Sequence, residues 1–164
     1  MDFLWTPWRY QYIAQAIAGN QPECIFCDAV ARNNDEATLI VHRGKTSFVI
    51  LNLYPYTSGH VMIVPYAHVG ELSKCDVATL AEIMQLAQRV ETIFHGIYKP
   101  DGMNFGMNLG RAAGAGVTGH LHLHALPRWV GDANFMTVTA ETRIHAEALA
   151  TTYQKFREAF GKNA

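Results

Sequence analysis

The sequence predicts an α+β fold with an antiparallel sheet of about five strands, a long central helix and a C-terminal helix. Two observations carry this prediction. Short segments rich in β-branched and apolar residues follow one another with few helices between them, and one long segment repeats its apolar residues at helical spacing. Because strands that follow one another through short connections pair as neighbours, an antiparallel sheet is favoured over a doubly wound parallel one.

The first three strands are expected in the first half of the chain. Residues 37–43 and 46–53 are β-type segments separated by Arg43-Gly44-Lys45, which predicts a hairpin. After a loop at 54–59, residues 60–65 predict a third strand that a proline closes.

The long helix is expected to start at Ser73 or Asp76, either of which can cap it, and to run to about Tyr98, with Pro100 beyond its end. Its apolar residues recur on one face, which is predicted to point inward. These residues are Leu80, Met84, Ala87, Val90, Phe94 and Ile97.

Two more strands and a last helix complete the expected fold. Residues 104–109 predict the fourth strand, and residues 120–127 alternate with period two and predict the fifth. A C-terminal helix is expected over about 145–160. Its inward residues are predicted to be Leu149, Tyr153, Phe156 and Phe160.

Length and composition predict one globular domain over residues 1–164, with an N-terminal aromatic arm at 1–20. The chain is 49% hydrophobic and 16% charged, which excludes a disordered protein, and its longest apolar runs are too short to cross a bilayer. The first residues do not form a signal peptide, so we expect a cytoplasmic protein. The net charge of −1 lacks the positive surface of a general nucleic-acid binder.

Three of the eight histidines lie at every second position, as His120, His122 and His124. On a strand such residues share one face, with side chains about 6–7 Å apart. Burying three imidazoles for packing alone would leave many ring nitrogens in need of partners. The row therefore predicts chemistry, either a metal site in which the histidines hold a catalytic zinc or nucleophilic attack by a neutral imidazole on phosphorus.

A glycine-rich run at 110–119 immediately precedes the histidines and favours phosphorus chemistry. Glycines let backbone N–H groups approach phosphate oxygens without a Cβ in the way. Gly114, Gly116 and Val117 of this run are the predicted substrate-binding positions, and Arg111 and Arg128 are candidate cationic donors on either side.

These motifs resemble the histidine-triad (HIT) family, whose signature alternates three histidines with apolar residues, as HLHLHAL does at 120–126. The segment FVILNLYPYTSGHVMIVPYAHVGEL at 48–72 is similar to the strand, loop and strand of the family. The segments WTPWRYQYI at 5–13, NLGRAAGAG at 108–116 and WVGDANFM at 129–136 resemble a bacterial branch close to diadenosine tetraphosphate phosphorylases and hydrolases.

The resemblance implies an enzyme that cleaves dinucleoside polyphosphates or related nucleotide conjugates through a covalent nucleotidyl-histidine intermediate. It makes His122 the nucleophile toward the α-phosphorus and places His124 and His60 at positions that contact phosphate and assist the leaving group. Asn52 matches a ribose-binding position and Asn108 a position beside the bridging oxygen. Splitting one displacement into two steps lets a single histidine serve first as nucleophile and then as leaving group.

Cys24 and Cys27 form a CxxC half-site of the type that binds zinc, although no second half-site follows in the sequence. The resemblance to some bacterial members implies that His68 and the first triad histidine, His120, complete a structural Zn²⁺ site. Two cysteines without metal at a turn or helix start remain the alternative. No organic cofactor is expected.

Several functional alternatives stay open from the sequence. The acceptor is either water or inorganic phosphate, which would make the enzyme a hydrolase or a phosphorylase. A metalloenzyme with zinc on the triad and a nucleotide-binding regulatory module are the other two classes. The expected partners are adenine nucleotides and, by resemblance to the family, a second copy of the chain in a homodimer.

Overall fold

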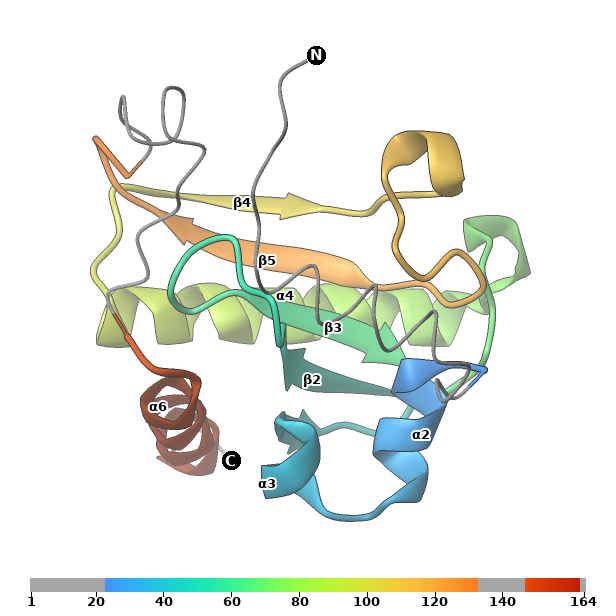
Figure 1. Ribbon diagram of the computed structural model, residues 1–164, viewed down its shortest axis with the longest axis horizontal. Coiled ribbons are helices and arrows are strands. Elements are labelled where there is room, and N and C mark those ends of the chain that lie inside the picture. Colours follow the sequence, from blue (N-terminus) through green and yellow to red (C-terminus); the bar gives the residue numbers. More distant parts are fainter. Residues whose placement is uncertain (1–22, 133–146, 163–164) are drawn as a thin grey trace, which may run out of the picture.

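The computed structural model describes residues 23–132 and 147–162. The expected N-terminal arm at 1–20 and the first residues of the expected C-terminal helix lie outside these ranges. The described residues form a five-stranded antiparallel sheet with the order β1-β2-β3-β5-β4 (Figure 1). The strands are β1 Ile40–Arg43, β2 Ser47–Leu51, β3 Val61–Pro65, β4 Gly102–Gly106 and β5 Leu123–Arg128. The predicted α+β class and antiparallel sheet are confirmed.

The predicted hairpin between β1 and β2 is present, and Glu82 holds its turn. The carboxylate of Glu82 accepts hydrogen bonds from the backbone N–H groups of Lys45 and Thr46 at 2.7 and 2.6 Å. A Cβ on Gly44 would lie 2.8 Å from the backbone carbonyl oxygen of Ser47, so the close approach favours glycine here. The two hydrogen bonds to Glu82 fix the turn to the long helix that carries this residue.

Two short helices that were not predicted from the sequence precede the sheet. They are α2 Ile25–Ala31 and α3 Asp35–Thr38, and Asn34 caps α3 by accepting a hydrogen bond from the N–H of Ala37 at 3.2 Å. The prediction of a strand from residue 37 was therefore wrong at its start. The helix continues to Thr38, Leu39 turns the chain with a φ of 64°, and β1 begins at Ile40.

The long helix α4 Val77–Ile97 packs on one face of the sheet and lies behind it in Figure 1. Asp76 caps it by accepting a hydrogen bond from the N–H of Thr79 at 2.9 Å, as predicted. The predicted inward position of Met84 is wrong, because its side chain is 59% exposed. Ile83 and Leu86 are buried instead.

Side chains along the central strands point alternately to the two faces of the sheet, and they form a separate hydrophobic cluster on each face. Val49 and Ile63 face α4 and the C-terminal helix, whereas Phe48 and Met62 face α2 on the opposite side. The C-terminal helix α6 Leu149–Lys162 buries Tyr153, Phe156 and Phe160 against the first cluster, as predicted, but begins later than residue 145.

The last two strands differ from their predicted bounds, and both differences concern residues of the expected site. β4 ends at Gly106, so Asn108 lies beyond the strand rather than in it. β5 begins at Leu123, so His120 and His122 precede the strand. The N–H of Leu121 bonds to the carbonyl of Val69 at 2.7 Å, outside the sheet ladder. Within the described residues, no helix combines the length and apolar character needed to span a membrane.

Candidate active site and metal centre

The candidate catalytic histidines converge around the start of β3 and β5. His60 directly precedes β3, His122 directly precedes β5, and His124 is the second residue of β5, where it pairs with Met62 of β3. Met62 belongs to the hydrophobic cluster on the α2 side of the sheet. His60 is thus brought next to His124, although the two residues are distant in sequence.

A backbone carbonyl sets the tautomer of His122. Its Nδ1 lies 2.9 Å from the carbonyl oxygen of His120, which can only accept a hydrogen bond, so Nδ1 carries the proton. In the neutral ring the lone pair is then on Nε2. The side chain is 6% exposed, and this burial lowers the pKa of His122 below its ordinary value. A neutral imidazole with a free Nε2 is the form that a nucleophilic role requires.

His122 and His124 lie closer together than an ideal strand predicts. Their ring centroids are 4.9 Å apart and the rings meet edge to face at 80°. The separation is shorter than the expected 6–7 Å because His122 precedes the strand and its ring is held by the carbonyl of His120. Two of the three triad side chains are therefore in direct contact.

A chain of hydrogen bonds sets the tautomers of the other two imidazoles. The N–H of Tyr56 donates to Nδ1 of His60 at 3.1 Å, so the proton of His60 is on Nε2. Nε2 of His60 lies 2.9 Å from Nδ1 of His124, and His124 therefore accepts there and carries its own proton on Nε2. Burial, with the nearby His122 as a smaller cause, lowers the pKa of His124 to about 4, so this ring is neutral near pH 7.

The predicted ribose-binding residue, Asn52, lies beside this histidine pair. Its Oδ1 accepts a hydrogen bond from the N–H of Tyr54 at 2.9 Å, and its Nδ2 is 3.3 Å from Nδ1 of His60. The side chain is half-buried. Asn52 therefore orders the loop before β3 in addition to facing the candidate site.

The structure places the predicted phosphate-binding residues on the segment between β4 and β5. Gly114 has a φ of +89°, a conformation that favours glycine, and a Cβ on Gly114 or Gly116 would meet no atom within 4 Å. Val117 is partly buried against the α2-side cluster, and Asn108 is half-buried. The backbone at Gly114 and Gly116 is thus open to an approaching ligand, while no described hydrogen bond joins these two glycines to His60, His122 or His124.

Arg128 was predicted as a candidate cationic donor to phosphate, but its guanidinium is bound to other side chains of the protein. Its guanidinium donates to both carboxylate oxygens of Asp132 at 2.6 and 2.8 Å and to Oδ1 of Asn104 at 2.8 Å. The bidentate pair ties the end of β5 to the following turn. Arg111 lies in a short 3₁₀ helix, η2 Arg111–Ala113, and is exposed.

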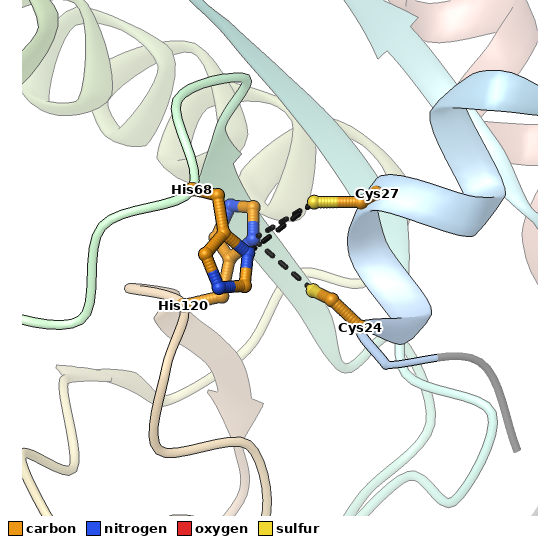
Figure 2. A group of neighbouring side chains, drawn as sticks. All are labelled: Cys24, Cys27, His68 and His120. Carbon is orange, nitrogen blue, oxygen red and sulfur yellow. Dashed lines mark hydrogen bonds between the residues drawn. The ribbon is translucent and has the colours of Figure 1, made fainter.

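Cys24, Cys27, His68 and His120 form a second cluster (Figure 2). One ligand atom from each residue lies within 4.8 Å of all the others. Nδ1 of His120 is 3.3 Å from Sγ of Cys24 and 3.7 Å from Sγ of Cys27, and Nδ1 of His68 is 3.4 Å from Sγ of Cys27. Sulfur and nitrogen ligands of a tetrahedral zinc ion are about 3.5 Å apart. The spacing and the Cys₂His₂ donor set therefore fit zinc.

Contacts behind the ligands prepare His120 for a metal. Its Nε2 lies 2.8 Å from the carbonyl oxygen of Pro65, so the proton is on Nε2 and the lone pair of Nδ1 faces the sulfurs. The segments that carry His68 and His120 also cross closely, since a Cβ on Gly70 would lie 2.7 Å from the carbonyl oxygen of Thr118. Four protein ligands leave no open position, which is typical of a structural site.

Two residues near the histidines were not assigned a role from the sequence. Phe26 contacts the rings of His120 and His122 at centroid distances of 5.3 and 5.2 Å. Tyr56 lies against His60, with ring centroids 4.7 Å apart. The position of Phe26 between two candidate metal ligands indicated that it lies near the site. No local sequence feature indicated the contact of Tyr56 with His60.

Comparison with known proteins agrees with this geometry. Residues 33–130 match the HIT domain. The chain is 39% identical over 154 residues to the AP-4-A phosphorylase of Mycobacterium tuberculosis, an alignment that covers 91% of this chain and 79% of the relative.

Two solved structures are similar to the chain as well. A Zn-bound histidine triad family protein from Mycobacterium smegmatis has a TM-score of 0.69 and 25% identity, covering 85% of this chain and 94% of the other. A histidine triad nucleotide-binding protein from Sulfolobus tokodaii has a TM-score of 0.69 and 28% identity, covering 85% and 93%. The chain therefore belongs to the histidine triad (HIT) family.

Proposed function

We propose that this chain is a nucleotidyl hydrolase or transferase that cleaves dinucleoside polyphosphates, such as diadenosine tetraphosphate, or related nucleotide conjugates at the α-phosphorus. The observation that carries the proposal is the hydrogen bond from Nδ1 of His122 to the carbonyl of His120, which leaves Nε2 free beside His124. The AP-4-A phosphorylase of M. tuberculosis supports the substrate class.

In the first step, Nε2 of His122 attacks the α-phosphorus, and the bond from that phosphorus to the bridging oxygen breaks. The leaving polyphosphate takes the bonding electrons, and with diadenosine tetraphosphate it is ATP. The Nε2–H of His124 donates a hydrogen bond to the departing oxygen, in the tautomer that His60 and the N–H of Tyr56 support. A polyphosphate is a stable anion, so this hydrogen bond is sufficient assistance.

In the second step, water or inorganic phosphate attacks the phosphorus of the nucleotidyl-histidine, and His122 leaves with the lone pair restored on Nε2. Water yields AMP, whereas phosphate yields ADP. Asn52 would bind the ribose and Asn108 would lie beside the bridging oxygen. Backbone N–H groups at Gly114, Gly116 and Val117 would bind phosphate oxygens, and the open space around both glycines supports this assignment.

The second cluster would hold a structural Zn²⁺ through Cys24, Cys27, His68 and His120. When bound, the ion cross-links three segments, namely the start of α2, the loop after β3 and the segment before β5. The neighbouring Zn-bound family structure supports this choice of metal. The residues of the site participate in no chemical step.

Two other classes of function are less well supported. A metalloenzyme with zinc on the triad would need His120 to join His122 and His124. His120 faces the cysteines instead, and among the described residues the triad forms no metal-type cluster of its own. A nucleotide-binding regulatory module would bind nucleotide without turnover, and a neutral imidazole whose Nδ1 proton is held by a backbone carbonyl, leaving the lone pair on Nε2, does not favour that function.

The proposal extends to assembly and location. Within the described residues, β4 is an edge strand with no charged residue, and its Phe105 is 40% exposed. Such an edge can pair with another strand. We place a homodimer at this edge, in the cytoplasm, with adenine nucleotides as substrates.

A product assay with a quenched-flow step tests the function. Pure protein is incubated with diadenosine tetraphosphate with and without inorganic phosphate, and the products are separated. ATP with AMP indicates a hydrolase, ATP with ADP indicates a phosphorylase, and unchanged substrate after long incubation contradicts both. Mass spectrometry of rapidly quenched enzyme should find one added AMP, which the His122→Ala variant should lack. Activity without any such adduct, abolished by a chelator at once, would instead favour the metalloenzyme.

A further inference from the structure

Phe26 connects the metal cluster to the nucleophile. It lies between Cys24 and Cys27 in sequence, and its ring packs on His120 at 68° and on His122 at 44°. The side chain is 2% exposed. One phenyl ring thus touches both a candidate metal ligand and the residue that is placed to attack phosphorus.

The hydrogen bond of His122 does not by itself fix the plane of its imidazole. The bond from Nδ1 to the carbonyl of His120 limits rotation about the Cα–Cβ and Cβ–Cγ bonds of the side chain, but a hydrogen bond tolerates some change in length and angle, so the ring can still tilt. Tilting would move Nε2, which is the atom that must point at the α-phosphorus. Packing against the ring therefore limits where Nε2 points.

Phe26 and His124 supply that packing. The centroid of Phe26 is 5.2 Å from that of His122, and His124 meets the same imidazole edge to face at 4.9 Å. Phe26 is itself held by α2, which begins directly after Cys24 and includes Cys27. Cys24 and Cys27, two members of the candidate metal cluster, thus lie on either side of the phenyl ring in sequence.

We propose that Phe26 is a positioning residue that holds the imidazole of His122 in the orientation for in-line attack. The inference rests on the proposed function. The near-complete burial of Phe26 argues that its ring acts on His122 and not on the nucleotide directly. Because a misplacement of about 1 Å in a reacting group can cost roughly 100-fold in rate, loss of the ring should lower the rate of attack more than it weakens binding.

The test compares Phe26→Leu with a matched control, Phe48→Leu. Phe48 is fully buried in the same hydrophobic cluster, but its ring packs on Tyr66 at 5.3 Å. With diadenosine tetraphosphate, Phe26→Leu is expected to lower kcat by about tenfold or more while KM stays within about twofold. Single-turnover formation of the nucleotidyl-histidine should slow by the same factor, and bound metal should stay at one equivalent. Phe48→Leu should keep kcat within about twofold.

Each other outcome overturns the inference. Unchanged kcat in Phe26→Leu, or an equal loss in Phe48→Leu, would show that the ring has no specific effect on His122. A raised KM at unchanged kcat would assign Phe26 to nucleotide binding, and a loss that added zinc restores would assign it to metal retention. If Phe26→Leu does not fold, Phe26→Met is used with the same expected division between kcat and KM. Failure of the proposed function is distinguishable, because His122→Ala would then still form the adduct or retain turnover.

Discussion

Nε2 of His60 lies 2.9 Å from Nδ1 of His124, although the two residues are 64 positions apart in sequence. The N–H of Tyr56 occupies Nδ1 of His60, so the shared proton belongs to His60 and the only proton of His124 is on its Nε2. The pair thus presents one N–H donor to the candidate site while His122 presents one lone pair. This difference between neighbouring imidazoles gives them separate roles in phosphoryl chemistry.

Replacing the nucleophile should abolish turnover without abolishing binding. His122→Ala is expected to lower kcat by about 1000-fold or more, because it removes the imidazole whose Nε2 lone pair is the proposed nucleophile. Nucleotide affinity, measured by calorimetry with AMP, should change by only a few fold. His124→Ala should be slower than the parent enzyme but still form the adduct. Equal losses in both variants, with no adduct in either, would contradict the assigned roles.

Removing a thiolate should remove the metal. Cys24→Ser is expected to lose about one equivalent of zinc by elemental analysis and to lower Tm by about 10 °C, since zinc in a four-ligand site contributes directly to folding stability. Cys75→Ser is the matched control, because Cys75 is buried but lies outside the cluster. Retention of zinc in Cys24→Ser, or an equal loss in Cys75→Ser, would exclude the site.

Much of the fold could be predicted from local patterns. The hairpin around Gly44, the cap of α4 at Asp76 and the inward face of α6 depend on residues close together in sequence. The helices α2 and α3 were not predicted because they have 7 and 4 residues, too few for helical periodicity to show. The inward assignment of Met84 failed because α4 turns the neighbouring Ile83 toward the sheet.

The candidate site could be predicted only in part. The metal ligands came from the CxxC half-site and from resemblance, and the structure brings all four together. The strand was expected to begin at His120, but the carbonyl of His120 accepts from the side chain of His122 and the N–H of Leu121 bonds to Val69. The first of these hydrogen bonds is made by a nearby side chain and the second by a distant loop. An alternating pattern of apolar residues predicts neither of them. The contacts of Phe26 and Tyr56 depend on the tertiary fold in the same way.

The exposed edge of β4 predicts a dimer that one charge should disrupt. Wild-type protein is expected to sediment at about twice the 18.3 kDa mass of the chain, and Phe105→Lys should sediment as a monomer because a lysine on an edge strand opposes pairing. Val77→Lys is the control, since Val77 is 82% exposed at the start of α4, away from this edge. A monomeric wild-type protein would contradict the dimer. A dimer unaffected by Phe105→Lys would show that the dimer contact does not lie at the edge of β4.

The buried histidines should make folding stability depend on pH in the acid range. The pKa of His124 is about 4 in the folded protein and about 6.5 in the unfolded chain, because burial disfavours the charged ring. Between these values the unfolded chain binds the additional proton, so stability is complete above about pH 6.5 and is lost as the pH falls toward 4. Burial lowers the pKa of His42 and His122 as well, which steepens the same dependence of folding stability on pH. Urea midpoints measured from pH 7.5 to 4 should therefore fall, and the fall should be smaller in His124→Gln, which keeps a polar side chain but cannot titrate. An identical slope in the variant would mean that His124 is not held neutral by the fold.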